Sequence, residues 1–193
     1  MSAEARKPYD IETLTNVAVR VFAERGYDGA SMDDVARAAG ITKASIYHHV
    51  TGKEALLGRG LRRALDALSA ILEEPGSNRG SAGARLEHLV RRVAEVTFDL
   101  LPELSVLFRI RGNSPTELDA LAHRRRFDRT IASLVRQAQN EGSVRSDIDP
   151  GVATRLIFGM SNSTVEWFRA DGHSSPGELA DAICKLAFGG LKI

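Results

Sequence analysis

The chain has 193 residues, of which 43% are hydrophobic and 26% are charged, a composition typical of a folded globular protein and not of a disordered one. The formal net charge of +1 is uninformative, so any binding to nucleic acid has to depend on where the basic residues lie. A single cysteine excludes a disulfide within the chain, and no apolar run approaches the roughly 18 residues of a membrane span. The first eight residues are polar and lack the apolar core of a signal peptide. We therefore expect a cytoplasmic protein.

Two helices are expected before residue 40. Apolar residues recur at helical spacing over residues 11–22, and Gly26 ends this run. Ser31 opens a second, shorter helix, because Asp34 follows it by three residues and completes a capping box. Gly40 is placed to end the second helix.

A third helix is expected to open at Thr42. Ile41 and Ile46 occupy the two positions of a hydrophobic staple around its start. Two short helices separated by residues 39–41 have the spacing of a helix-turn-helix, and Gly40 supplies the positive φ that the tight turn needs. In such units the second helix lies in the major groove of DNA, with its N-terminal residues towards the base edges.

The distribution of charge agrees with DNA binding. Residues 35–53 contain Arg37, Lys43 and Lys53 and no acidic residue. Short or flexible side chains stand at the start of the third helix, and Tyr47 and His48 follow about one turn later, within reach of phosphates or bases. A helical hairpin with a solvated polar face has the same pattern, so both interpretations are open at this point.

Beyond residue 53 the pattern is again helical. A fourth helix begins near Lys53, with Thr51 and Glu54 placed to cap it, and residues 75–83 are expected to form a loop. Further helices are expected over residues 86–102, 102–110, 115–140, 150–170 and 176–189, the last two opening at Asp149-Pro150 and at a capping box of Ser175 and Glu178. We expect an all-α protein of about nine helices, with an N-terminal three-helix domain over residues 1–52 and a C-terminal helical bundle over residues 53–193.

Residues 18–57 resemble the DNA-binding domain of the TetR (tetracycline-repressor-like) family of transcriptional regulators. The residues that carry the resemblance are Phe22, Gly26, Tyr27, Ser31, Ile41, Ile46, Tyr47, His49, Lys53, Leu56 and Leu57. Val50 departs from the family, which more often has phenylalanine there, and this smaller apolar side chain concerns packing and not DNA binding. The resemblance implies a homodimeric repressor that binds a palindromic operator and is released by a small-molecule effector.

The resemblance also implies which residues meet the operator. They are Ser31, Thr42, Lys43, Ala44, Ser45, Tyr47, His48 and Lys53. Lys43 is the candidate for reading a guanine, whereas Lys53 at the start of the next helix would hold a phosphate. Arg6 and Lys7 are either a flexible arm that reaches a groove or a solvated terminus.

The last two predicted helices are the candidates for dimerisation. Large apolar residues recur along them at helical spacing, and the candidate contacts are Leu156, Ile157, Met160, Leu179, Ile183 and Leu186. Two such helices from each subunit would form a four-helix interface. The alternative is that these residues close the core of their own subunit.

An effector pocket is expected where aromatic residues and arginines lie close in the sequence. Its candidates are Phe98, Leu101, Phe108, Arg109, Arg111, Arg125 and Phe127. Apolar walls with arginines suit an amphipathic anion. The last sixty residues, notably VEWFRADG and FGGL, are more weakly similar to TetR-type regulators of fatty-acid or acyl-CoA catabolism, which implies an acyl-CoA or related effector. The alternative for the arginines is ion pairing on the surface with Glu117, Asp119 and Asp128.

Other function classes have less support. The chain has no dinucleotide-binding glycine motif, no phosphate loop and no Gly-x-Ser-x-Gly motif, so we do not expect an enzyme. The histidines lack the spacing of metal ligands, so neither a metal nor a cofactor is expected, and Cys184 between apolar neighbours is expected in the core. Two alternatives to the acyl-CoA sensor are a multidrug-type sensor that controls an efflux gene and an architectural DNA-binding module without a ligand.

Overall fold

The structure, a computed structural model, describes residues 10–169 and 171–191. This part of the chain contains ten helices and no strand, which confirms the all-α prediction. The helices are α1 (Ile11–Arg25), α2 (Met32–Ala39), α3 (Lys43–Tyr47), α4 (Lys53–Glu73), α5 (Pro75–Asn78), α6 (Ala82–Asp99), α7 (Leu101–Arg109), α8 (Pro115–Asn140), α9 (Pro150–Trp167) and α10 (Pro176–Leu191). Within the described residues, none of the helices is both long and apolar enough to cross a membrane.

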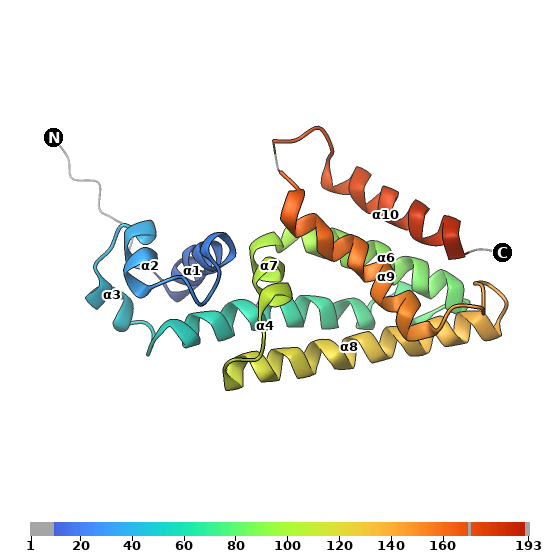
Figure 1. Ribbon diagram of the computed structural model, residues 1–193, viewed down its shortest axis with the longest axis horizontal. Coiled ribbons are helices and arrows are strands. Elements are labelled where there is room, and N and C mark those ends of the chain that lie inside the picture. The colour runs from blue at the N-terminus through green and yellow to red at the C-terminus, as the bar shows by residue number, and fades with distance from the viewer. Residues whose placement is uncertain (1–9, 170, 192–193) are drawn as a thin grey trace.

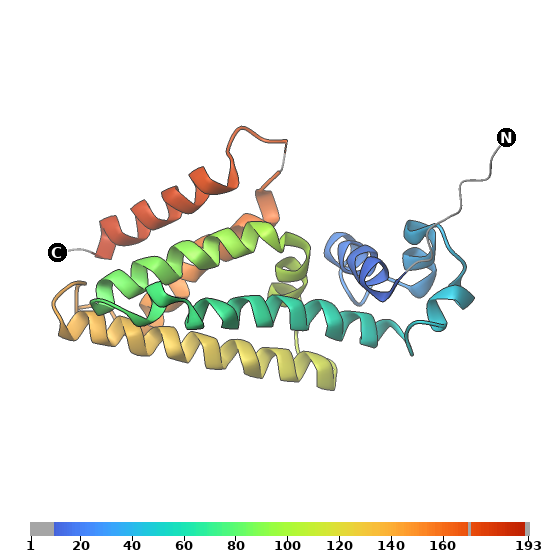
Figure 2. The same ribbon diagram turned by 180° about the vertical axis from the view of Figure 1, so that it is seen from behind.

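The helices form an elongated molecule with a small unit at one end (Figure 1). Helices α1, α2 and α3 make up this three-helix unit, and α4 extends from it into a bundle formed with α6 to α10. In the view from behind, α6, α4 and α8 lie side by side (Figure 2). Helix α4 packs against α1 in the three-helix unit and against α6, α7 and α8 in the bundle, so it belongs to both parts.

A single apolar core runs through both parts. Leu14 of α1, Leu57 of α4, Leu104 of α7 and Ile131 of α8 are completely buried in one continuous cluster. At one point the contact between α1 and α4 depends on a missing side chain: a Cβ atom at Gly60 would clash with a methyl group of Val19. The three-helix unit is therefore packed directly on the long helix and not merely tethered to it.

Four helices, α2, α3, α9 and α10, begin where the sequence predicts a cap. Ser175 and Glu178 form the predicted capping box, in which the amide of Ser175 donates to the Glu178 carboxylate at 2.8 Å. Asp149 accepts a hydrogen bond from the amide of Val152 at 3.0 Å, with Pro150 as the first residue of α9. These local bonds satisfy amide groups that no carbonyl within the helix can reach.

Two predictions about the middle of the chain are wrong. Thr51 and Glu54 do not cap α4, which begins after Gly52 without a side-chain cap. The carboxylate of Glu54 instead accepts hydrogen bonds from Thr116 and Ser114 at the start of α8, and these lower its pKa. Residues 75–78 form the short helix α5 and not a loop, because the Ser77 hydroxyl donates to the carbonyl of Ile71 at 2.6 Å and folds the segment back on α4. This turn adds a tenth helix to the nine expected.

Candidate DNA-binding, dimer and effector sites

The predicted helix-turn-helix is present in α2 and α3. Ser31 and Asp34 form the capping box at the start of α2, with the Ser31 amide 3.0 Å from the Asp34 carboxylate. Gly40 ends α2 in the left-handed conformation, at φ 65°, and the amide of Ile41 donates to the carbonyl of Ala36 at 3.1 Å. Thr42 then caps α3 by accepting the amide of Ser45 at 3.1 Å. Each step of this turn was predictable because its bonds join residues no more than five positions apart.

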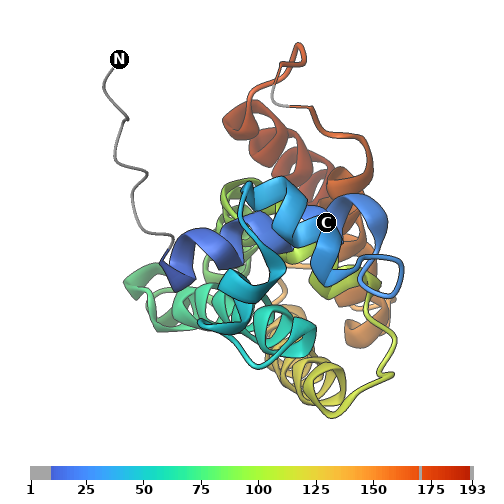
Figure 3. The ribbon, with the colours of Figure 1, turned by 90° about the vertical axis from the view of Figure 1, so that its left-hand side faces the viewer.

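Helix α3 lies at the end of the molecule farthest from the bundle (Figures 1 and 3). Ile46 is completely buried and anchors α3 on the core of the three-helix unit. Lys43, Ala44, Tyr47 and His48 are exposed around it, as an α-helix with one apolar face requires. The predicted contact residues of α3 are thus on one accessible surface, at the end that a DNA duplex can approach.

The predicted base-reading lysine has an acidic partner. The ammonium of Lys43 lies 2.9 Å from a carboxylate oxygen of Asp33 on α2, and this hydrogen bond raises the pKa of Lys43. Both side chains are about half exposed. A DNA base that accepts hydrogen bonds from Lys43 therefore competes with Asp33 for the N–H groups of the same ammonium.

Ser31 and Thr42 have hydroxyls that serve the helix caps described above. Ser31 also bonds the Asp34 carboxylate through its hydroxyl at 2.6 Å, and Thr42 lies 2.8 Å from the hydroxyl of Ser45. Asp34 in addition pairs with Arg25 and Arg37, and its pKa falls to about 2 mainly because Ser31 donates to it. These bonds fix the starts of α2 and α3 relative to their neighbouring side chains.

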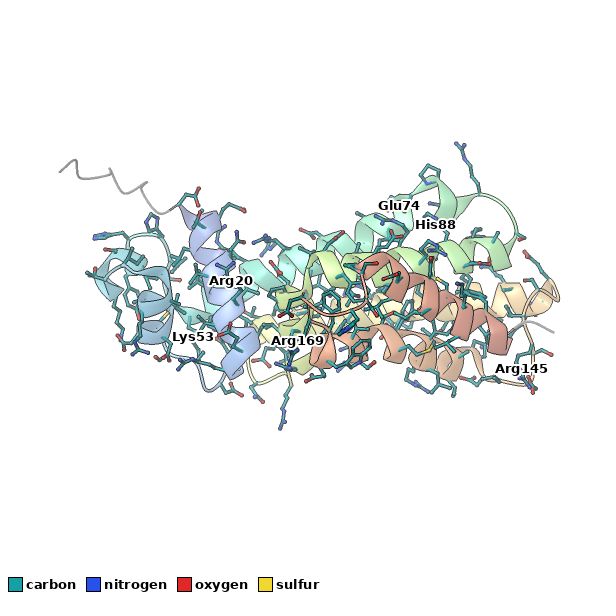
Figure 4. The ribbon with its side chains drawn as sticks, turned by 90° about the horizontal axis from the view of Figure 1, so that it is seen from above. Arg20, Lys53, Glu74, His88, Arg145 and Arg169 are labelled. Carbon is teal, nitrogen blue, oxygen red and sulfur yellow. The ribbon has the colours of Figure 1, made fainter. Side chains whose placement is uncertain are left out.

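Lys53 is a clear difference from expectation. Its ammonium donates to the carbonyls of Tyr27 at 2.8 Å and Ala30 at 2.9 Å, and it lies 4.3 Å from the centre of the Tyr27 ring. Lys53 is labelled beside α1 in Figure 4. The side chain for which a phosphate contact is predicted thus makes contacts within the chain, and its ammonium fastens the loop between α1 and α2 to the start of α4. Arg6 and Lys7 lie outside the described residues.

The candidate dimer contacts divide into two groups. Leu156 of α9 and Leu186 of α10 are 63% and 69% exposed, and Trp167 at the end of α9 is 52% exposed. Ile157 and Ile183 are buried in the core of their own subunit, which agrees with the alternative interpretation, so their side chains are not accessible for the predicted dimer contacts. Met160 and Leu179 are half-buried, so their exposure is intermediate between that of the two groups. The sequence pattern did not separate neighbouring residues that a helix turns about 100° apart.

The aromatic residues predicted for the effector pocket fill the core instead. Phe98 packs on Phe168 with ring centres 4.9 Å apart, and Phe127 packs on Phe158 at 6.1 Å. Leu101 and Phe108 are half-buried, and the guanidinium of Arg124 lies 5.0 Å from the centre of the Phe108 ring. The structure thus places Phe98 and Phe127 in two separate ring pairs, one formed with Phe168 and the other with Phe158, and each pair is packed.

The predicted arginines do not converge on that core. Arg109 binds the carboxylate of Glu166 and the carbonyl of Ala23. Arg111 and Arg125 are exposed, and neither side chain has an ion pair among the described residues. One of the alternative partners also differs from expectation, since buried Glu117 accepts three backbone amides of residues 111–113 and not a guanidinium.

A groove of about 1080 Å³ lies elsewhere, between α1, α4 and the first half of α8. Its floor is apolar, with Leu61, Leu65 and Ala120. Its rim is charged, with Glu12, Glu54, Arg59, Arg62, Arg63, Asp66, Asp119, His123 and Arg126. Sequence reasoning missed this groove, although Ala55, Gly58 and Arg62 recur on one face of α4 at helical spacing. Only the packing of α8 against α4 shows that this face borders a groove.

The remaining reactive groups are structural. No group of three potential metal ligands occurs among the described residues. His88 of α6 forms a hydrogen bond with Glu74 at 2.7 Å (Figure 4), and Arg92 of α6 forms an ion pair with the same carboxylate. Glu74 thus joins the end of α4 to α6. Cys184 is buried, and burial raises the pKa of its thiol above the usual range.

The comparisons with known proteins agree with this architecture. Residues 14–59 match the model of bacterial regulatory proteins of the tetR family, and residues 79–191 match that of the tetracyclin repressor-like C-terminal domain. A crystal structure of a TetR transcriptional regulator family member from Streptomyces coelicolor A3 is 50% identical, with a TM-score of 0.87 over 100% of this chain and 96% of the other. The HTH-type transcriptional repressor KstR2 of Rhodococcus jostii is 28% identical over 92% of this chain and 89% of the relative.

A third relative has both ligand and DNA bound. The structure of AibR in complex with isovaleryl coenzyme A and operator DNA is 25% identical, with a TM-score of 0.78 over 92% of this chain and 97% of that one.

The C-terminal family match alone spans more than half of the chain. The chain belongs to the TetR family. It is a ligand-responsive, DNA-binding transcriptional repressor. The relatives named here are transcriptional regulators and not enzymes.

Proposed function

We propose that the protein represses genes as a homodimer on a partly palindromic operator and leaves it when an acyl-CoA or a related amphipathic anion binds. The observation that carries the DNA-binding part is the exposed surface of α3, with Lys43, Tyr47 and His48 at the end of the molecule. DNA is in the cytoplasm of a bacterial cell, and we expect the protein to act there. We divide the chain into a DNA-binding domain, residues 1–52, and a ligand-binding and dimerisation domain, residues 53–193.

In this proposal Lys43 and Ala44 face base edges, and Tyr47 and His48 reach bases or phosphates. Ser31, Thr42 and Ser45 hold the helix starts and contact the nearby phosphates in addition. The ammonium of Lys53 donates to two backbone carbonyls, so in this proposal the backbone amides of the uncapped start of α4 take over the phosphate contact. In this arrangement α3 determines which bases are recognised, and the start of α4 fixes the register of the protein on the duplex.

The dimer interface in this proposal is the outer face of α9 and α10. Leu156 and Leu186 are the most exposed large apolar side chains among the described residues. Val152 and Trp167 extend the same apolar surface along α9. Covering these side chains removes apolar area from water, which is the main driving force of association. Met160 and Leu179 lie at the edge of this surface.

The effector site in this proposal has an apolar and an ionic part. An acyl chain enters the aromatic core at Phe98, Leu101, Phe108 and Phe127, which has to open to receive it. The phosphates of the coenzyme lie in the groove, where Arg59, Arg62 and Arg126 stand on the rim without an ion pair to a described residue. Arginine suits phosphate because its planar fork donates two hydrogen bonds at once. The complex of AibR with isovaleryl coenzyme A supports this ligand class.

DNA binding is tested by selecting duplexes from a random-sequence pool with the full-length protein. We expect recovered sites with two matched half-sites, because a dimer with two-fold symmetry presents two copies of α3. Sedimentation measures the assembly in the same buffer. A monomer that shows no preference for any palindrome contradicts the proposal.

The effector class is tested by titrating isovaleryl-CoA and longer acyl-CoAs into the complex with the selected operator. Fluorescence anisotropy should fall at micromolar acyl-CoA, and Arg62→Ala should require more ligand, whereas the exposed Arg125→Ala should not. Release by neutral or cationic drug-like compounds, with no response to acyl-CoAs, would favour a multidrug-type sensor. No response to any compound would favour an architectural DNA-binding module.

A further inference from the structure

Arg109, the last residue of α7, joins three separate parts of the molecule. Its Nη1 donates to the carbonyl of Ala23 in the last turn of α1 at 2.6 Å. Its Nε and Nη2 donate to the two carboxylate oxygens of Glu166, in the last turn of α9, at 3.2 and 2.9 Å. One side chain thus contacts the DNA-binding domain and the end of a proposed dimer helix at the same time.

The contact with Ala23 satisfies a group that α1 itself leaves free. The last four carbonyls of a helix have no amide partner within it, and a cation at that end also interacts favourably with the helix dipole. Arg109 provides both, from a residue 86 positions later in the chain. Because α7 packs against α1, α4 and α9, the position of α1 follows that of the α7 end.

The contact with Glu166 reports on the packing of α9. Glu166 is followed by Trp167, which is exposed, and then by Phe168, whose ring packs on buried Phe98. A ligand that separates Phe168 from Phe98, or a shift of α9 at the subunit interface, therefore moves the carboxylate that holds Arg109. The guanidinium is rigid and planar, so it cannot follow Glu166 and keep its direction towards Ala23.

We propose that Arg109 is a positioning residue that sets the orientation of the DNA-binding domain on the bundle, according to the place of Glu166 at the end of α9. This inference rests on the proposed function for its biological meaning. The Arg109–Glu166 pair is partly exposed, at 39% and 60%, and such pairs contribute little to stability. Its role is therefore in geometry: without it, α1 and α3 take up a wider range of orientations, and fewer molecules fit two half-sites at once.

The test measures that range directly within one chain. Spin labels are placed at Arg20→Cys on α1, an exposed position labelled in Figure 4, and at Arg136→Cys, an exposed position on α8, in a Cys184→Ala background. The labelled chain is diluted with unlabelled protein, and electron–electron double resonance gives the distance distribution. Arg109→Ala should broaden the distance distribution. Arg109→Lys should give an intermediate width, because an ammonium has no planar fork. Glu166→Gln should broaden the distribution in part. The matched control, Arg111→Ala, removes an exposed arginine two residues away and should change nothing.

Two further measurements separate positioning from folding and from the proposed function. The melting temperature of Arg109→Ala should stay within a few degrees of the parent, while its affinity for the selected operator falls severalfold. Equal distance distributions and operator affinities for Arg109→Ala and Arg111→Ala would overturn the inference, as would broadening that appears only with a large loss of melting temperature. The spin-label distances need neither dimer, operator nor effector, so a failure of the proposed function is read separately in sedimentation and operator selection.

Discussion

The ammonium of Lys53 donates to the backbone carbonyl of Tyr27 and at the same time lies against the face of the Tyr27 ring, 4.3 Å from its centre. The two residues are 26 positions apart, and the contact closes the loop that precedes α2 onto the start of α4. Burial, with a smaller effect of Glu54, raises the pKa of Tyr27 to about 12, so the ring stays neutral beneath the cation at any physiological pH. The contact therefore joins the loop before the helix-turn-helix directly to α4.

Replacement of Lys53 should therefore act through folding. Lys53→Met removes two hydrogen bonds from a charged donor and one cation–π contact, and we expect a loss of about 1–3 kcal/mol in the free energy of unfolding. Denaturant titration followed by circular dichroism measures this loss. If Lys53 instead held a phosphate, its replacement would reduce the salt slope of DNA binding by about one and leave the free energy of unfolding unchanged. That second result would return Lys53 to the DNA interface.

Asp33 should limit the affinity of the protein for DNA of any sequence. Asp33→Asn releases Lys43 from its ion pair and removes a negative charge from the DNA-facing surface. We expect tighter binding to non-specific duplex, with a steeper dependence on salt, because a freed cation can displace another counterion. Lys43→Ala should act in the other direction and relax selection at one base pair by about 1–3 kcal/mol. Anisotropy titrations at several salt concentrations compare both variants with the parent, and identical curves for all three would remove Lys43 from the interface.

Gly60 should be intolerant of even one methyl group. Gly60→Ala places a Cβ atom against Val19, so α1 has to move away from α4. We expect a loss of about 1–3 kcal/mol in the free energy of unfolding, the usual cost of overpacking. The matched control is Gly177→Ala in the first turn of α10, where an added Cβ atom meets nothing within 4 Å. A control that loses as much as Gly60→Ala would show that the effect is not steric.

Leu156 and Ile157 should give opposite results although they are adjacent. Leu156→Glu places a charge on the exposed face of α9 and should yield a folded monomer in sedimentation, since burying an unpaired charge at the interface costs several kcal/mol. Ile157→Glu places the charge in the subunit core and should cause loss of helical structure in circular dichroism. A dimer that persists with Leu156→Glu and with Leu186→Glu would locate the interface on another surface.

Several features of the protein could be determined from the sequence by itself. The starts of α2, α3, α9 and α10 and the tight turn at Gly40 follow from side-chain caps and a glycine with positive φ. These features involve bonds between residues at most five positions apart, so the neighbours in the chain decide them. The helix-turn-helix, the all-α fold and the family were accessible for the same reason.

Only the tertiary structure decided which side chains were already engaged. Lys53 could not be assigned to the loop after α1, nor Arg109 to Ala23 and Glu166, because the partners lie 23 to 86 positions away and meet only when α4, α7 and α9 pack. The faces of α9 were undetermined for a related reason: Leu156 and Ile157 are equally apolar, and the helix rotation that buries one of them is set by its neighbours α6 and α8. Long-range contacts and helix rotation depend on the whole core, which no local pattern of residues specifies.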